Sequence, residues 1–94
     1  MSELVEVMHF TNTLMERSHY NEIELLALLE EDDSLEDALN ALELTLHPIE
    51  TLYEHLGYDK LHVLYRVSCA THGRRSPLST HLYNAMMLAQ ELCP

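Results

Sequence analysis

The chain has 94 residues, 47% of them hydrophobic, with only two glycines and three prolines. Sixteen acidic residues against five basic ones give a formal net charge of −11 at pH 7. This charge argues against direct binding to nucleic acid, because phosphate contacts need clustered lysine and arginine, and the apolar content argues against a disordered chain. The length allows one domain, residues 1–94, and abundant leucine with alanine, glutamate and methionine favours helices over strands.

The sequence has no feature of an exported or membrane-spanning protein. Glu3 and Glu6 stand where a signal peptide carries basic residues. No apolar run approaches the roughly 18 residues that a membrane span needs. Cys69 and Cys93 lie in different segments without the spacing of a metal or redox motif, which predicts small apolar residues in a reducing compartment. We therefore expect a cytoplasmic protein that does not enter a membrane.

The beginning of the chain predicts two helices. Residues 3–18 carry an apolar stripe at helical spacing, and Ser2 can cap the start of this helix. Asn21 is a good N-cap for a second helix over residues 22–31. That second helix is apolar almost all round, which is typical of a helix that lies centrally in the core or is covered on its second side by a partner.

The longest pattern in the chain is a heptad seam from Leu35 to Leu56. The acidic run of residues 30–33 should end the preceding helix, because its charges oppose the negative end of the helix dipole, and Asp33 or Ser34 then caps the new element. Steps of four and three residues alternate between the apolar positions of the seam: Leu35, Leu39, Leu42, Leu46, Ile49, Tyr53 and Leu56.

Pro48 interrupts this seam. A proline inside a helix removes one backbone hydrogen bond and costs about 3 kcal/mol. The unbroken apolar spacing favours a kinked helix that continues, whereas the restriction on His47 before the proline favours an end near Leu46. We expect a break or a sharp kink at this point.

The second half of the chain predicts shorter helices. Gly57 should end the long element as a glycine beyond the helix C-terminus, and Asp59 should cap a helix over residues 60–71. The Ser-Pro pair at 76–77 is a strong start for a last helix that runs to about Leu92. The sequence therefore predicts an all-α fold, a compact bundle of five or six short antiparallel amphipathic helices.

Catalytic and metal chemistry have little support in the sequence. Glu-x-x-His spacing occurs at residues 6/9 and 16/19, but both pairs share one helix, whereas carboxylate-bridged metal sites take such pairs from different helices. Cys69 has His72 one turn away but lies on an apolar helix face, where a thiol is usually inert. With only two glycines, the chain has no glycine-rich phosphate loop. We predict no enzyme activity, no metal and no cofactor.

One basic stretch is a candidate anion-binding site. Arg74, Arg75 and Ser76 immediately precede a predicted helix N-terminus, where free backbone N–H groups favour negative charge. A carboxylate of a partner, or of this chain's own acidic half, could bind there. The alternative is that the two arginines only balance charge within the molecule.

The sequence is most consistent with a protein-binding module: a chaperone, adaptor or inhibitor of another protein that forms a homo-oligomer such as a dimer, or a hetero-oligomer. The apolar seam is expected to provide the affinity for this partner, and an acidic face to provide the selectivity for a basic surface. The expected partner-binding residues are Leu39, Leu42, Leu46, Ile49 and Tyr53 of the seam and Glu43, Glu50 and Glu54 of the acidic face. An alternative is mimicry of nucleic acid, in which the fourteen acids of residues 1–56 occupy and block a basic groove.

Overall fold

The computed structural model of this chain describes residues 3–92, which contain five helices and no strand. The helices are α1 (Glu3–Met15), α2 (Glu22–Glu31), α3 (Asp33–Leu44), α4 (Ile49–His72) and α5 (Pro77–Leu92). The prediction of an all-α fold is confirmed. The expected cap Ser2 and the cysteine Cys93 lie outside the described residues.

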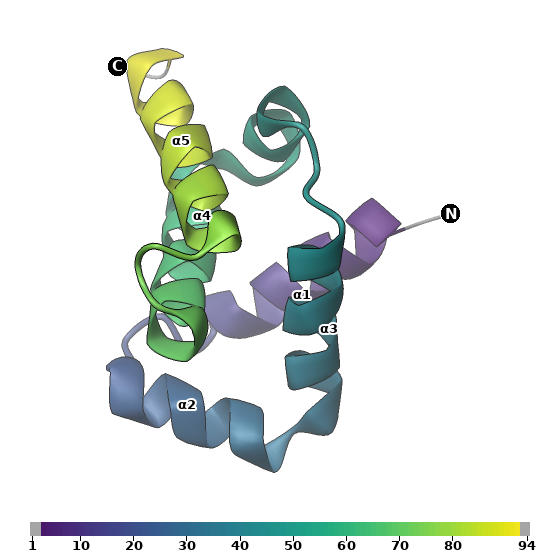
Figure 1. Cartoon of the computed structure of the whole chain (residues 1–94), viewed down its shortest axis with the longest axis vertical. Coiled ribbons are helices and arrows are strands. Elements are labelled where there is room, and N and C mark those ends of the chain that lie inside the picture. Colours follow the sequence, from purple (N-terminus) through teal and green to yellow (C-terminus); the bar gives the residue numbers. More distant parts are fainter. Residues whose placement is uncertain (1–2, 93–94) are drawn as a thin grey trace.

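The helix pair α4 and α5 forms the scaffold of the fold. These two helices share the most extensive packing in the molecule, and Figure 1 shows α5 beside the C-terminal part of α4. The helices α1 and α2 both pack on α4, and α3 packs on α1, α2 and α5. Figure 1 also shows α1 and α2 running across the α4–α5 pair rather than alongside it, so the helices are not all antiparallel neighbours.

A buried group of hydroxyls fixes the turn between α4 and α5. The Ser79 hydroxyl donates a hydrogen bond to the Gly73 carbonyl at 2.7 Å and accepts one from the Ser76 hydroxyl at 2.9 Å. Ser68 of α4 places its own hydroxyl 2.7 Å from that of Ser79. Because Ser68 and Ser79 are fully buried, these bonds satisfy groups that would otherwise be costly to remove from water.

The ends of the helices follow local capping chemistry. Asn21 caps α2 with both bonds of a capping box: its side chain accepts from the Glu24 N–H at 2.8 Å, and the Glu24 carboxylate accepts from the Asn21 N–H at 2.9 Å. The first helix ends at Met15 rather than at Ser18, because residues 16–19 form tight turns.

The acidic run breaks the chain as expected, but the cap is a different residue. Asp32 is at once the C-cap of α2 and the N-cap of α3, and its carboxylate accepts from the Ser34 N–H at 3.0 Å and from the Ser34 hydroxyl at 2.6 Å. The prediction that Asp33 or Ser34 caps this helix is therefore wrong by one or two residues. Asp32 takes the role because its side chain reaches the free N–H groups of the first turn.

The expected break near Pro48 is confirmed. Helix α3 ends at Leu44, residues 45–48 are not helical, and α4 begins at Ile49 with Pro48 as its N-cap. The expected stop at Gly57 is also confirmed, because this residue has φ 77° and ψ 172° and is not helical. Helix α4 therefore consists of two helical parts that are joined by a kink at Gly57. The chain can bend there without strain because glycine has no Cβ.

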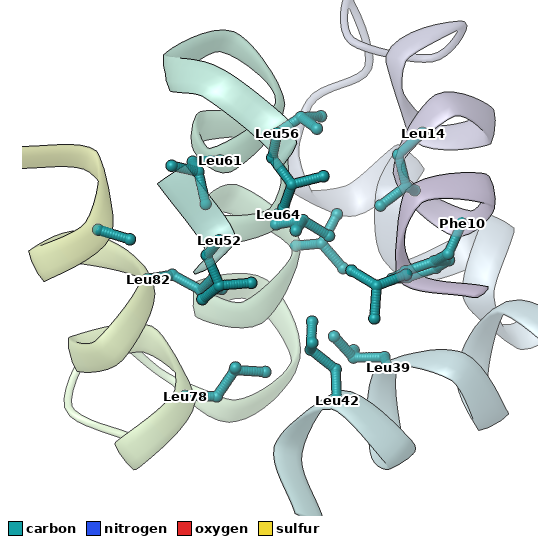
Figure 2. Packing of buried hydrophobic residues seen from close by; sticks show 14 of the residues in the cluster. Phe10, Leu14, Leu39, Leu42, Leu52, Leu56, Leu61, Leu64, Leu78 and Leu82 are labelled. Carbon is teal, nitrogen blue, oxygen red and sulfur yellow. The ribbon is translucent and has the colours of Figure 1, made fainter. Parts of the chain in front are cut away.

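One hydrophobic core fills the space between the helices. Figure 2 shows side chains from α1, α3, both parts of α4, and α5 meeting in it. The labelled core residues are Phe10, Leu14, Leu39, Leu42, Leu52, Leu56, Leu61, Leu64, Leu78 and Leu82. Because the chain changes direction at residues 45–48, α4 buries Leu52 and Leu56, and the seam does not continue from α3 into α4 as one stripe.

Candidate partner-binding groove

The apolar residues of the predicted seam are divided between the core and the surface. Leu39 and Leu42 are 1% and 2% exposed and belong to the core of the single chain. Ile49 and Tyr53 are partly buried against that core. Leu46 is 41% exposed in the segment between α3 and α4. In this conformation, Leu39 and Leu42 are therefore not accessible to a partner, whereas Leu46 is.

The predicted acidic face is also divided. Glu43 lies on α3, while Glu50 and Glu54 lie on α4 beyond the break, so the three carboxylates do not share one helix face. A carboxylate oxygen of Glu43 is 3.7 Å from Nδ1 of His72 at the end of α4. Glu50 and Glu54 are exposed to solvent. The break at residues 45–48 therefore separates Glu43 from the two glutamates that the regular spacing predicts on the same helix face.

A broad concave surface lies between α1 and α3. It is a hollow of about 830 Å³ that reaches from Val5 to Thr13 on α1 and from Asp32 to Ala41 on α3. A smaller hollow of about 110 Å³ continues it towards Thr45 and His47. We call this continuous surface the α1–α3 groove. Its lining residues are Val5, Glu6, Val7, His9, Phe10, Thr13, Asp32, Ser34, Leu35, Asp37, Ala38, Ala41, Leu42, Thr45 and His47.

The groove exists because α3 presents small side chains where it faces α1. Ala38 and Ala41 are three residues apart and so lie on one face of the helix, and both line the two hollows. Phe10 and Leu35 are largely buried beneath them and give the groove an apolar floor. Val5 remains 63% exposed at its edge. Larger side chains in place of the alanines would fill this space.

Charges of one sign surround the apolar floor. The carboxylates of Glu6, Asp32 and Asp37 line the groove, and no lysine or arginine does. The hydrogen bond from the Ser34 hydroxyl lowers the pKa of Asp32 below its usual value, helped by the Ser34 and Leu35 backbone N–H groups and opposed by desolvation. This carboxylate is therefore ionised at neutral pH. The groove is apolar at its base and negative at its rim.

Further apolar side chains are exposed close to the end of α3. Leu44 is 86% exposed in the last position of this helix, and Leu46 follows two residues later. On α2, Leu25 and Leu29 are buried while Ile23 is 77% exposed. The second helix therefore buries one face, and Ile23 on another side is left largely uncovered by residues 3–92.

The predicted anion-binding residues lie together in the turn before α5. Arg74 and Arg75 are exposed, and neither makes an ion pair within residues 3–92. The Ser76 hydroxyl is already used, because it accepts from the Ser79 N–H at 3.1 Å and donates to the Ser79 hydroxyl. Ser76 therefore shapes this turn, and the arginines are the groups available to a ligand.

The residues considered for chemistry are dispersed. Cys69 is partly buried, and Nε2 of the nearby His72 is buried with no hydrogen-bond partner in the described residues. Residues 3–92 contain no group of three or more histidine, cysteine, aspartate or glutamate side chains placed to hold a metal ion. Over the same residues, no helix combines the length and apolarity needed to cross a bilayer.

Sequence reasoning missed the groove because its two walls are far apart in the chain. The heptad spacing points to the large apolar residues of α3, which the structure buries, and not to the alanines beside them. The signal that was present is the pair Ala38 and Ala41, three residues apart in a helix that also carries Asp37. Comparison with known proteins adds no assignment: no protein-family model, no curated protein and no solved structure matches this chain.

Proposed function

We propose that this protein is a non-enzymatic binding module that takes a basic, amphipathic helix of another protein into the α1–α3 groove. The observation that carries this proposal is the combination of an apolar floor with a rim that carries three carboxylates and no lysine or arginine. An amphipathic helix fits both features, because its apolar stripe can cover the floor while lysine or arginine on its flanks meets the rim.

The apolar part of the groove would provide the affinity. Ala38 and Ala41 have small side chains, so the backbone of a bound helix can approach α3 closely. Val5, which lines the groove and is 63% exposed, offers apolar surface that binding removes from water. Burial of apolar surface contributes roughly 25 cal/mol per Å², before the costs of ordering the two partners.

The acidic part would select the partner and accelerate its approach. Residues 1–56 carry fourteen acids and one base, so a positively charged helix is attracted before it makes contact. Charges on the rim of an interface change the association rate and its salt dependence more than the lifetime of the complex. We also propose that the protein acts in the cytoplasm. It would serve there as a chaperone, an adaptor or an inhibitor of the protein that carries this helix.

Mimicry of nucleic acid is the competing function, and it makes a different use of the same charges. A mimic binds through its acids alone, so its affinity collapses in high salt. Docking of a helix on an apolar floor keeps most of its affinity when the charges are screened. Salt dependence therefore separates the two functions.

The test uses a designed amphipathic peptide of leucine and lysine, with a leucine and glutamate peptide of the same pattern as its counterpart. Binding is measured by fluorescence anisotropy at low salt and at high salt. We expect the lysine peptide to bind, to retain measurable affinity in high salt, and to bind at least about tenfold more tightly than the glutamate peptide, a difference of roughly 1.4 kcal/mol.

Two matched substitutions locate the site. Ala41→Gln fills the groove without changing its charge, and Ala27→Gln makes the same change on an exposed position of α2. Glutamine is a good helix former, so both variants should fold. We expect Ala41→Gln to weaken binding about fivefold or more, roughly 1 kcal/mol, and Ala27→Gln to leave it unchanged. Equal effects of the two substitutions, or no binding at all, would refute the groove as the site.

A further inference from the structure

The turn between α4 and α5 lies against a second hollow, which is lined by basic residues where the α1–α3 groove is lined by acidic ones. This hollow has a volume of about 580 Å³ and is lined by Tyr65, Arg74, Arg75, Thr80 and Tyr83. We call it the arginine–tyrosine hollow. Its lining contains no acidic residue, although the chain carries sixteen of them. The turn therefore concentrates positive charge and aromatic surface on an otherwise acidic molecule.

We propose that the arginine–tyrosine hollow binds a small ligand that combines a phosphate with a planar aromatic group, that is, a mononucleotide. Each part of the ligand has a matching part of the hollow. Arginine presents a planar fork of N–H donors that pairs with phosphate oxygens, and Thr80 adds a hydroxyl close to the start of α5. The tyrosine rings offer faces on which a base can stack.

The arginines are available for this role. Arg66, by contrast, is used by the fold, since its guanidinium donates to the carbonyls of Ser18 and Tyr20. Arg17 lies beside Glu16, with 3.7 Å between charged atoms. Arg74 and Arg75 have no such partner among the described residues, although both are exposed in a chain with a large excess of acids. Arg74 and Arg75 are neighbours in the sequence, and both line the same hollow.

The turn that carries the arginines is fixed by hydrogen bonds that do not involve Arg74, Arg75 or Thr80. The hydroxyls of Ser68, Ser76 and Ser79 bond to one another and to the Gly73 carbonyl beneath the turn. Tyr65 and Tyr83 pair across α4 and α5, with ring centroids 5.9 Å apart and the planes tilted by 46°. Because Tyr83 is 46% exposed, one ring remains open to a ligand. Because the turn itself is fixed, binding has to order only the arginine side chains and not the backbone that carries them.

The net charge of the chain favours binding of a small ligand over binding of a nucleic acid strand. The Debye length at physiological ionic strength is about 8 Å, which is shorter than the 12.2 Å radius of gyration of the chain. A ligand confined to the hollow therefore experiences mainly the two arginines. A nucleic acid strand would extend beyond them over a molecule of net charge −11 and be repelled.

The experiment titrates the whole chain with AMP, adenosine and inorganic phosphate at moderate salt, and follows binding by calorimetry or by amide chemical shifts. Stacking of a base on an aromatic side chain strengthens binding by about 5- to 150-fold. We expect AMP to bind at least about fivefold more tightly than inorganic phosphate, and more tightly than adenosine. Inorganic phosphate as tight as AMP, or no binding of AMP at millimolar concentration, would overturn the proposal.

Matched variants assign the binding to this hollow. The double variant Arg74→Ala/Arg75→Ala should lose at least about tenfold in AMP affinity, and Arg17→Ala, which removes an arginine elsewhere, should lose none. Tyr83→Ala should reduce AMP to the affinity of phosphate, and Tyr58→Ala, another tyrosine that is 38% exposed, should not. Full AMP affinity in the double arginine variant would overturn the proposal. A short oligonucleotide that binds more tightly than AMP would also overturn it, in favour of a strand-binding site.

Discussion

Asp32 shows how much one side chain decides in a chain of this size. Asp32 is the C-cap of α2, where its backbone N–H donates to the Leu28 carbonyl at 3.1 Å. It is also the N-cap of α3, where its carboxylate accepts a hydrogen bond from the Ser34 N–H. The two helices therefore meet at a single residue with no loop between them. The direction of α3, and with it one wall of the α1–α3 groove, depends on this corner.

The capping bond predicts a specific pH dependence of stability. The Ser34 hydroxyl lowers the pKa of Asp32 in the folded chain, so the ionised carboxylate is favoured by folding. Its contribution is complete above the usual aspartate pKa of about 3.9 and is lost as the pH falls through the lowered folded pKa. Asparagine caps helices well but does not titrate. We expect thermal unfolding between about pH 5 and pH 2 to show a steeper loss of stability in the wild type than in Asp32→Asn.

Asp33→Asn is the control for this measurement, since it removes a neighbouring charge from the same corner without removing the cap. We expect the loss of stability of Asp33→Asn with falling pH to follow that of the wild type, and to follow it more closely than the loss in Asp32→Asn does. Identical profiles for wild type and Asp32→Asn would show that the carboxylate at residue 32 does not contribute in its charged form.

At the scale of the element, the two parts of α4 contribute side chains to the core from two different directions. The kink at Gly57 allows Leu52 and Leu56 to face the core from one part and Leu61 and Leu64 from the other. Gly57 holds φ at +77°, a value that residues with a side chain rarely adopt. No heavy atom lies within 4 Å of the place that a Cβ would take. Conformation, and not lack of space, is therefore what requires glycine there.

This distinction predicts the effect of Gly57→Ala. Because the added methyl group meets no neighbour, the cost comes from the backbone alone, and we expect a loss of about 1–3 kcal/mol in the free energy of unfolding. Urea denaturation followed by circular dichroism measures it. An unchanged or higher stability, accompanied by a gain in helix content, would mean that α4 can straighten and that the kink is not needed by the core.

At the scale of the whole molecule, the charges are poorly compensated. Among residues 3–92, Arg17 and Glu16 form an exposed ion pair at 3.7 Å. Glu43 lies 3.7 Å from His72, which pairs with it as an ion only when the imidazole is protonated. Exposed pairs contribute at most about 1 kcal/mol. A net charge of −11 on a chain with a radius of gyration of 12.2 Å therefore opposes its own compact state, and occupation of the groove by a basic partner would relieve part of this repulsion.

Salt should therefore stabilise the isolated protein. Raising the sodium chloride concentration shortens the Debye length from about 30 Å at 0.01 M to about 3 Å at 1 M and screens the repulsion. We expect the thermal unfolding midpoint to rise with salt, and to rise less in a Glu30→Gln/Glu31→Gln variant that starts with less repulsion. A midpoint that falls with salt would show that favourable ion pairs outweigh the repulsion between the acids.

Much of the fold could be predicted from the sequence, because helices are specified locally. The bounds of α2, the cap at Asn21, the break before Pro48 and the start of α5 at Pro77 all follow from residues within one turn of the feature. The candidate site could be predicted only in part. The adjacency of Arg74 and Arg75 is visible in the sequence, whereas the tyrosines that share their hollow come from α4 and α5.

By itself, the sequence determined the helical class, the acidic character and which leucines are apolar enough to be buried, since these depend on composition and short-range spacing. Only the tertiary structure decided which apolar residues remain exposed. The break at residues 45–48 redirects α4, so the heptad seam becomes core at Leu39 and Leu42 and surface at Leu46. The α1–α3 groove likewise arises only when α1 packs on α3, because a concave surface needs two walls and the chain supplies them from segments about twenty residues apart.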